Sequence, residues 1–214
     1  ATVASEDSNF YKHKGLDIRG IVRAFIRDIQ NTSLAEGGST ITQQLVKKAL
    51  LGEEKTLSRK LKELLLAIEI ERRFTKDEIL WMYLNQIPYG SNAYGIESAS
   101  ATFFNKRASE LTIAESALLA GIPKAPTYFS PYGNHQAELF ARQKYILQRM
   151  YDLGYVDEAT LKTEQESQLT FSPKGTKIAA PHFVIMTKEY LVNKYGEDMV
   201  EGGGFKIITT LDAT

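Results

Sequence analysis

Three segments of this chain begin with the same helix-start pattern, and this repetition constrains the fold more than any other feature of the sequence. Thr40-x-x-Gln43, Thr75-x-x-Glu78 and Thr112-x-x-Glu115 each have the form of a capping box, in which two side chains bond N–H groups that would otherwise lack a partner at a helix start. Apolar residues recur at helical spacing elsewhere in the chain, whereas strict two-residue alternation is rare. The sequence therefore predicts a mainly α fold.

One predicted helix extends from about Thr56 to Arg73. Its apolar residues follow the i, i+3, i+4, i+7 pattern of a buried stripe: Leu61, Leu64, Leu65 and Ile68. Arg59, Lys60 and Glu63 lie three or four residues apart, so we expect them to share the opposite face. Taken alone, this face is typical of a solvated helix surface with ion pairs. Each such pair stabilises a helix by only ~0.3–0.5 kcal/mol.

Glycines and prolines indicate where several elements end. Three glycines follow apolar helical runs and could close them in the left-handed conformation: Gly52, Gly121 and Gly154. Prolines predict a loop over residues 122–134, and a helix follows over residues 136–153. Residues 205–210 come after three glycines and are the best strand candidate, and we place a domain boundary near residues 172–177.

The charge balance and the residue composition exclude several classes of function. Among 214 residues, 26 Lys and Arg balance 26 Asp and Glu, so we expect no nucleic-acid partner. The absence of cysteine excludes disulfides, thiolate nucleophiles and Cys-based metal sites. The three histidines form no His-x-x-x-His pair, which argues against a metal hydrolase. No run approaches the ~18 consecutive apolar residues of a membrane-spanning helix.

Three segments concentrate side chains that could carry chemistry. In the first, Glu6 and Asp7 precede Phe10, His13 and Gly15, and one of two adjacent carboxylates can act as a base while the other orients it. In the second, a glycine pair leads into the capped helix start of residues 37–47, whose N–H groups, hydroxyls, amides and lysine suit an anionic ligand. The Gly-Lys-Ser/Thr core of a P-loop is missing there. The third segment is the Arg59, Lys60 and Glu63 face.

In this order, the three segments closely resemble the motifs of glycosyltransferase family 51. This family is the peptidoglycan-polymerising domain of class A penicillin-binding proteins and of monofunctional transglycosylases. Its patterns ED-x-x-F-x-x-H-x-G, GGST-x-TQQL-x-K and RK-x-x-E are matched from Glu6, Gly37 and Arg59 onward.

Later elements extend the resemblance to roughly residues 1–155. The pattern K-x-x-IL-x-x-YLN is matched from Lys76, and YG-x-x-x-A-x-x-x-F and LLAG-x-PKAP are matched from Tyr94 and Leu118. One position departs from the family, because Lys48 stands where asparagine is usual. Either the contacts to phosphate or acceptor are retuned there, or Lys48 faces solvent.

The resemblance implies a lysozyme-like, mainly α fold with a long cleft between a large and a small lobe. It assigns residues 1–172 to the glycosyltransferase domain. Residues 173–214, with the predicted strand, would be a linker toward a transpeptidase domain whose motifs are absent here. We therefore expect the parent protein to carry an N-terminal membrane anchor and a C-terminal penicillin-binding domain.

The activity that the resemblance implies is polymerisation of lipid II into β-1,4-linked glycan strands, with inversion and release of undecaprenyl pyrophosphate. Glu6 would be the catalytic base for the acceptor 4-hydroxyl, and Glu63 the second essential carboxylate. The substrate-binding residues would be Asp7, Ser39, Thr40, Gln44, Lys47, Arg59, Lys60 and Lys124, with Asp7 orienting the site. The need for a divalent cation, Mg²⁺ or Mn²⁺, stays open, with Glu63 as its candidate ligand.

The resemblance places such an enzyme at the outer face of the bacterial cytoplasmic membrane. Its partners would be lipid II, the growing glycan chain, the membrane surface and cell-wall synthesis proteins. Residues 19–29 combine an apolar stripe with three arginines, which suits either an interfacial helix or an amphipathic core helix. Two alternatives stay open: a lysozyme-like glycan-cleaving enzyme, which needs no pyrophosphate clamp, and a non-catalytic module that binds the lipid-linked precursor.

Overall fold

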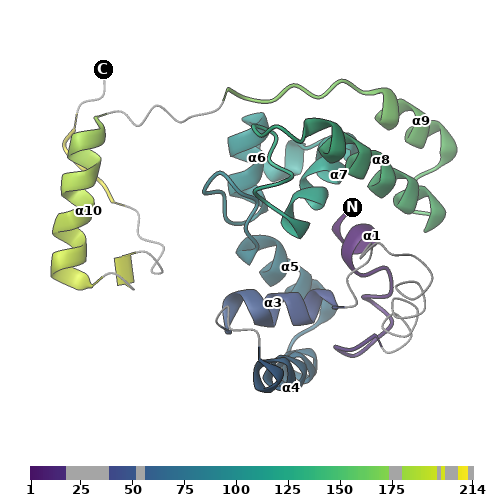
Figure 1. Cartoon of the computed structure of the whole chain (residues 1–214), viewed down its shortest axis with the longest axis horizontal. Helices are drawn as coiled ribbons and strands as arrows, with labels where there is room; N and C mark the ends of the chain where they lie inside the picture. The colour runs from purple at the N-terminus through teal and green to yellow at the C-terminus, as the bar shows by residue number, and fades with distance from the viewer. Residues whose placement is uncertain (18–38, 52–55, 174–179, 197–198, 201–206, 212–214) are drawn as a thin grey trace. The chain divides into compact units, whose positions relative to one another are not determined.

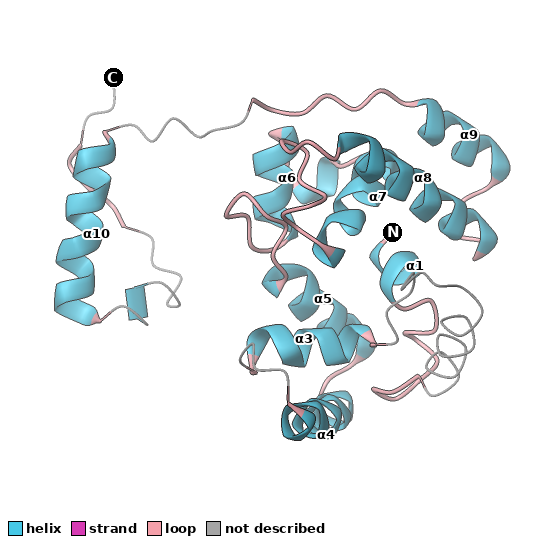
Figure 2. Cartoon of the chain, in the orientation of Figure 1, coloured by secondary structure: helices cyan, strands magenta, loops and turns pink. Residues whose placement is uncertain are grey.

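The computed structural model describes residues 1–17, 39–51, 56–173, 180–196, 199–200 and 207–211. The chain divides into two compact units, Ala1–Pro173 and Lys174–Thr214. Helices dominate the described residues (Figure 2), and their single β pairing is an isolated bridge between Pro88 and Tyr94. The predicted mainly α fold is confirmed.

The first unit contains eight α-helices among the described residues. These are α1 (Thr2–Glu6), α3 (Ile41–Ala49), α4 (Leu57–Arg73), α5 (Lys76–Gln86), α6 (Ile96–Phe104), α7 (Ile113–Gly121), α8 (Gln136–Asp152) and α9 (Glu158–Glu166). Two short 3₁₀ turns join them, η1 (Ala108–Glu110) and η2 (Ile122–Lys124). The second unit contains α10 (Pro181–Tyr195).

The predicted helix starts are confirmed. Thr40, Thr75 and Thr112 each form a complete capping box, and Thr56 accepts a hydrogen bond from the Arg59 N–H at the start of α4. The helix ends were predicted less well. Gly154 follows α8 with a φ of 74°, as expected, whereas Gly121 has a φ of −78° because α7 continues directly into η2. Gly52 lies outside the described residues.

The helices of the first unit form two groups that meet at α5 (Figure 1). In one group α3 packs against α4 and α5. In the other α7 packs against α8, α1 packs against α7 and α8, and α9 packs against α8. Fully buried side chains such as Phe10, Tyr83 and Phe103 belong to the main core, which joins the two groups. A smaller core of mainly small and aliphatic side chains fixes α1 to α7 and α8.

The predicted orientation of α4 is wrong. Leu61 and Leu65, expected to be buried, are 59% and 60% exposed, whereas Glu63 and Ala67 are 2% and 0% exposed. The inward face carries Glu63, Ala67 and Glu71, and Glu71 accepts a hydrogen bond from Thr42 of α3 at 2.5 Å. This face is held by polar contacts and a small side chain, and an apolar periodicity cannot reveal such a face.

Two further expectations concern segments near the ends of the chain. Residues 207–210 of the predicted strand are described and form no strand, because no described residue pairs with their backbone groups; residues 205–206 lie outside the description. The predicted amphipathic helix of residues 19–29 also lies outside it. Among the described helices, none combines the length and apolar character that crossing a membrane requires.

Candidate active site

The carboxylate of Glu6 is contacted through both of its oxygens. The amide Nε2 of Gln44 donates to Oε2 at 2.9 Å, and Nη2 of Arg142 lies 3.4 Å from Oε1. The Glu6 side chain is 12% exposed. Because 3.4 Å is long for a charge-assisted hydrogen bond, Oε1 keeps the capacity to accept a proton from another group. An oriented carboxylate with a spare lone pair has the geometry of a general base.

Packing of the short helix α1 positions Glu6. Ala4 is 1% exposed and lies in the smaller core with Ala117 and Ala120 of α7. The Ser5 hydroxyl reaches the Ala120 carbonyl oxygen at 3.4 Å. These contacts hold the last turn of α1 against α7, so the Glu6 carboxylate is presented to α3 and α8.

Tyr83 of α5 fixes the orientation of the Gln44 amide. Its hydroxyl donates to Gln44 Oε1 at 3.1 Å, which leaves the amide nitrogen facing Glu6. Burial, reinforced by the negative charge of Glu6, raises the pKa of Tyr83 well above its usual value, and the same two causes raise the pKa of Tyr89. Tyr83 therefore stays protonated and donates. Tyr83 belongs to the K-x-x-IL-x-x-YLN motif, but the motif alone indicates no role for it.

Asp7 and Thr40 are bonded to the protein itself. Oδ2 of Asp7 accepts from the Ile41 N–H at 3.1 Å and lies 2.8 Å from Nε2 of His13. Thr40, which is 2% exposed, caps α3 and donates to the Gly15 carbonyl at 2.7 Å. These contacts fix the start of α3 and suit an orienting role. Direct substrate binding by either residue stays a prediction.

A lysine and two other predicted residues meet near the start of α3. Lys60 Nζ lies 2.5 Å from Glu63 Oε1 and 3.4 Å from Ser39 Oγ. The Glu63 side chain is 3% exposed and that of Lys60 46%, so the carboxylate is buried while the ammonium reaches the surface. Lys60 is thus bonded to the residue just before the N-cap of α3, whereas Glu6 is bonded to Gln44 in the first turns of the same helix.

The remaining predicted cations lie on three different elements. Lys47 and Lys48 are exposed in the last turn of α3, and both lie within one turn of Gln44. Arg59 is half-buried in the first turn of α4. Lys124 is exposed at the end of η2, which begins just after the Gly121 carbonyl that accepts from Arg142 Nε at 2.9 Å. Whether Lys47, Arg59 and Lys124 meet a phosphate stays a prediction, and the exposure of Lys48 is compatible with a solvent-facing position.

Glu63 is the candidate ligand of a divalent cation, and whether a metal ion binds there stays a prediction. One of its oxygens is already paired with the Lys60 ammonium. Within the described parts of the chain, no three His, Asp or Glu side chains gather in a way that could hold a metal. We therefore derive no step through a divalent cation.

Arg142 contacts Glu6 but lies outside every motif that the sequence offered. It lies 136 positions from Glu6 in the chain, and an isolated arginine in a predicted helix carries no spacing signal. Its guanidinium lies over the Phe129 ring, 5.7 Å from the centroid, and bonds the Gly121 carbonyl. These contacts hold its remaining N–H groups toward Glu6.

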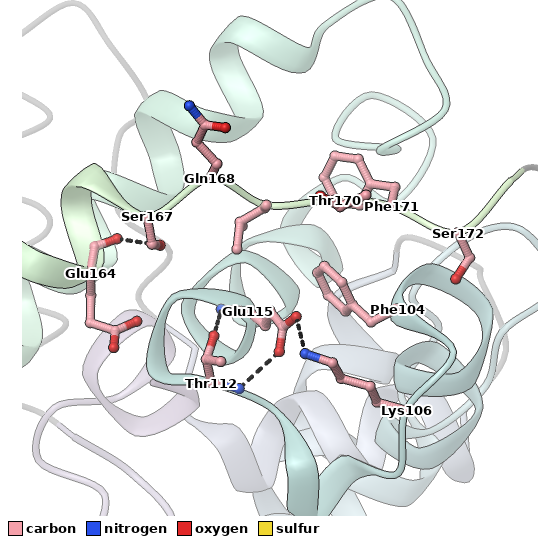
Figure 3. Close-up of a pocket in the computed structure, with 11 residues that line it drawn as sticks. Phe104, Lys106, Thr112, Glu115, Glu164, Ser167, Gln168, Thr170, Phe171 and Ser172 are labelled. Carbon is pink, nitrogen blue, oxygen red and sulfur yellow. Dashed lines mark hydrogen bonds and ion pairs between the residues drawn. The ribbon is translucent and has the colours of Figure 1, made fainter.

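A hollow of about 560 Å³ lies elsewhere in the first unit, and none of the predicted site residues lines it. Figure 3 shows Lys106, Glu115 and Phe171 among its lining residues. Glu115 is bonded to Lys106 at 2.7 Å and to the Thr112 N–H at 2.8 Å, and Glu164 accepts from the Ala114 N–H at 2.7 Å. Because this hollow contains none of the predicted catalytic or binding residues, we place the candidate active site at Glu6.

Comparison with known proteins gives consistent matches. The Transglycosylase family matches residues 1–151. Penicillin-binding protein 1A of Aquifex aeolicus is 44% identical over 212 residues, which cover 99% of this chain and 29% of that protein. Penicillin-binding protein 1A of Pseudomonas aeruginosa is 37% identical over 213 residues, covering 99% and 26%.

A solved structure gives a similar result. The crystal structure of penicillin-binding protein 1A from Haemophilus influenzae matches with a TM-score of 0.50 and 25% identity, over 75% of this chain and 20% of that one. The chain thus spans less than a third of the length of these relatives.

Proposed function

This chain belongs to the transglycosylase family of penicillin-binding proteins, and from that membership we propose that it is the glycan-polymerising domain of a cell-wall enzyme. Its substrate is lipid II, which it joins into β-1,4-linked glycan strands. The observation that carries this proposal is the Glu6 carboxylate at the end of α1, which Gln44 of α3 and Arg142 hold, together with the Lys60 ammonium, which reaches Ser39 just before α3.

Glu6 acts as the base in this reaction. Its Oε1 takes the proton from the 4-hydroxyl of the acceptor sugar as that oxygen attacks the anomeric carbon of the growing chain. A new C–O bond forms, the bond from the anomeric carbon to the pyrophosphate oxygen breaks, and the configuration inverts. Undecaprenyl pyrophosphate leaves with the electron pair. A positioned carboxylate base contributes typically ~10²–10⁴-fold to such a step.

Cations stabilise the charge that develops on the departing pyrophosphate. Lys60 is the best placed, because buried Glu63 and Ser39 hold its ammonium near the start of α3. Arg59, Lys47 and Lys124 complete this subsite. Preorganised cations of this kind act where charge develops in the transition state and need no rearrangement during the reaction. Glu63 contributes by positioning Lys60.

The substrate also determines where this domain acts. Lipid II carries an undecaprenyl chain, so the domain acts at the membrane surface, on the outer face of the bacterial cytoplasmic membrane. Its partners there are the growing glycan chain and other cell-wall synthesis proteins.

Substitution of Glu6 tests the proposal. The variant Glu6→Gln keeps the shape of the side chain and its contact with Arg142 but cannot accept a proton. We expect conversion of labelled lipid II into polymer to fall by at least ~10²-fold, with lipid II binding largely kept. Glu158→Gln changes an exposed glutamate of α9, away from the site, and as the matched control it should polymerise like the parent chain.

The product identifies which enzyme class is present. Muramidase-sensitive polymer from the parent chain, lost in Glu6→Gln, supports the glycosyltransferase. Cleavage of added glycan instead supports the lysozyme-like alternative. Binding of lipid II by a folded chain without any turnover supports a non-catalytic module and contradicts the proposal.

A further inference from the structure

We propose that Tyr128 and His135 form an aromatic platform that binds a sugar ring of the glycan strand beside the active site. Both residues belong to the segment that connects η2 to α8. This inference rests on the proposed function for the identity of the strand, whereas the platform itself follows from the packing of these two rings.

The two rings are stacked and rigidly supported. Their centroids are 3.9 Å apart and their planes differ by 16°. The Tyr128 ring also packs edge-to-face against Phe129, at 5.1 Å and 89°. Yet Tyr128 is 42% exposed and the His135 side chain 45% exposed. A ring that is already ordered loses little conformational entropy when a ligand binds it.

The platform is aligned with Glu6 along α8. His135 is the N-cap of α8, and Arg142 lies seven residues later, so the two share one face of the helix. They are about 10 Å apart along its axis. Phe129, next to Tyr128, lies under the Arg142 guanidinium, which contacts Glu6. A chain of contacts thus connects the platform to the base.

The surface chemistry around the platform suits a saccharide. A pyranose ring has an apolar C–H surface that packs on an aromatic ring, and hydroxyl groups at its edge that need hydrogen-bonding partners. Thr127 and Asn134 are exposed, adjacent in sequence to Tyr128 and His135, and supply a hydroxyl and an amide group. The amide nitrogen of exposed Gln136 donates to the Pro131 carbonyl, which leaves its oxygen to accept. Glu138 lies 3.6 Å from the His135 ring, and this negative charge disfavours an anionic lipid surface.

The binding test uses a probe that lacks the lipid and the pyrophosphate. The probe is a soluble oligosaccharide of alternating N-acetylglucosamine and N-acetylmuramic acid, with its affinity measured by calorimetry or ligand-observed NMR. We expect Tyr128→Ala to weaken binding about fivefold or more, which corresponds to about 1 kcal/mol of aromatic contact. Tyr128→Phe keeps the ring and should retain most of the affinity.

Controls keep the test independent of folding. Tyr151→Ala removes another exposed tyrosine, at the far end of α8, and should bind the probe like the parent chain. Thermal unfolding reports whether Tyr128→Ala is folded. If it is not, His135→Ala removes the other ring of the platform without removing a side-chain cap of α8, and it should weaken binding of the probe. Equal affinity of the parent chain, Tyr128→Ala and Tyr128→Phe overturns the platform. So does a Tyr128→Ala variant that loses binding to anionic vesicles but not to the oligosaccharide.

The polymerisation assay separates this inference from the proposed function. If the parent chain polymerises lipid II and Tyr128→Ala binds the probe unchanged, the function stands and the platform fails. If the parent chain makes no polymer but binds the probe in a Tyr128-dependent way, the platform stands and the proposed function fails.

Discussion

Buried Tyr83 links the chemistry of Glu6 to the stability of the folded chain. Its hydroxyl orients the Gln44 amide, and its phenol must stay neutral to do so. Burial and the charge of Glu6 both disfavour the phenolate, which is why the pKa of Tyr83 is raised. Tyr89 has a raised pKa for the same two reasons.

These raised pKa values predict a loss of stability at alkaline pH. Below about pH 10 the phenols are protonated in both folded and unfolded chains, and their contribution is fully present. Above it the unfolded chain releases these protons while the folded chain holds them, so the free energy of unfolding falls. Each phenol contributes up to about 1.4 kcal/mol per pH unit to this slope.

Urea unfolding of Tyr83→Phe between about pH 9 and pH 11.5 measures this contribution. The variant should lose stability less steeply with pH than the parent chain, because it has one fewer phenol to titrate. Tyr89→Phe should behave in the same way. In the double variant the free energy of unfolding should depend least on pH. Parallel stability curves for all four chains would contradict the placement of these two phenols.

At the scale of elements, α4 shows that polar contacts can decide which face of a helix is buried. Its leucine stripe satisfies the amphipathic pattern but remains exposed, while the face with Glu63, Ala67 and Glu71 packs inward. The Lys60–Glu63 ion pair compensates for the buried carboxylate. An additional Cβ at Gly15 would lie 3.2 Å from the Ala67 carbonyl oxygen, so the backbones approach closely here.

Two substitutions in α4 test this orientation. Ala67→Leu adds volume at a fully buried position and should lower the free energy of unfolding by about 1–3 kcal/mol. Leu65→Gln changes an exposed side chain and should stay within about 0.5 kcal/mol of the parent. Both values come from urea unfolding at neutral pH. If Leu65→Gln were the more damaging change, the predicted leucine stripe would be the buried face after all.

At the scale of the whole molecule, every residue of the two hydrophobic cores belongs to the first unit, residues 1–173. The extended segment after α9 completes the main core. Leu169 and Phe171 pack against it, with the Phe171 ring 5.6 Å from Phe104, and the Ser172 N–H bonds the Phe103 carbonyl at 2.8 Å. The roles assigned to residues 1–172 and 173–214 stay predictions.

Truncation of the chain tests whether the first unit is stable without the second. Residues 1–173 alone should fold with a Tm within about 2 °C of the full chain, because no core residue is removed. Residues 1–166 lose both Leu169 and Phe171, and their Tm should fall by roughly 5 °C or more. Calorimetry of the three chains checks this. A large loss on cutting at residue 173 would show that the second unit supports the first.

The sequence by itself determined the helical class, the helix starts and the family motifs, because capping boxes and motif spacings depend on residues close together in the chain. The structure places Glu6, Gln44, Lys60 and Glu63 near α3, and their roles stay predictions. Their selection relied on the family resemblance, since adjacent acids or a charged helix face are common on ordinary surfaces.

The tertiary structure alone decided which face of α4 is buried and which partners hold Glu6. Arg142 reaches Glu6 across 136 positions, and Tyr83 reaches Gln44 across 39. Such pairs depend on how helices pack, and no local spacing encodes them. The same holds for residues 207–210, whose β-branched side chains favour a strand, because a strand also needs a pairing partner.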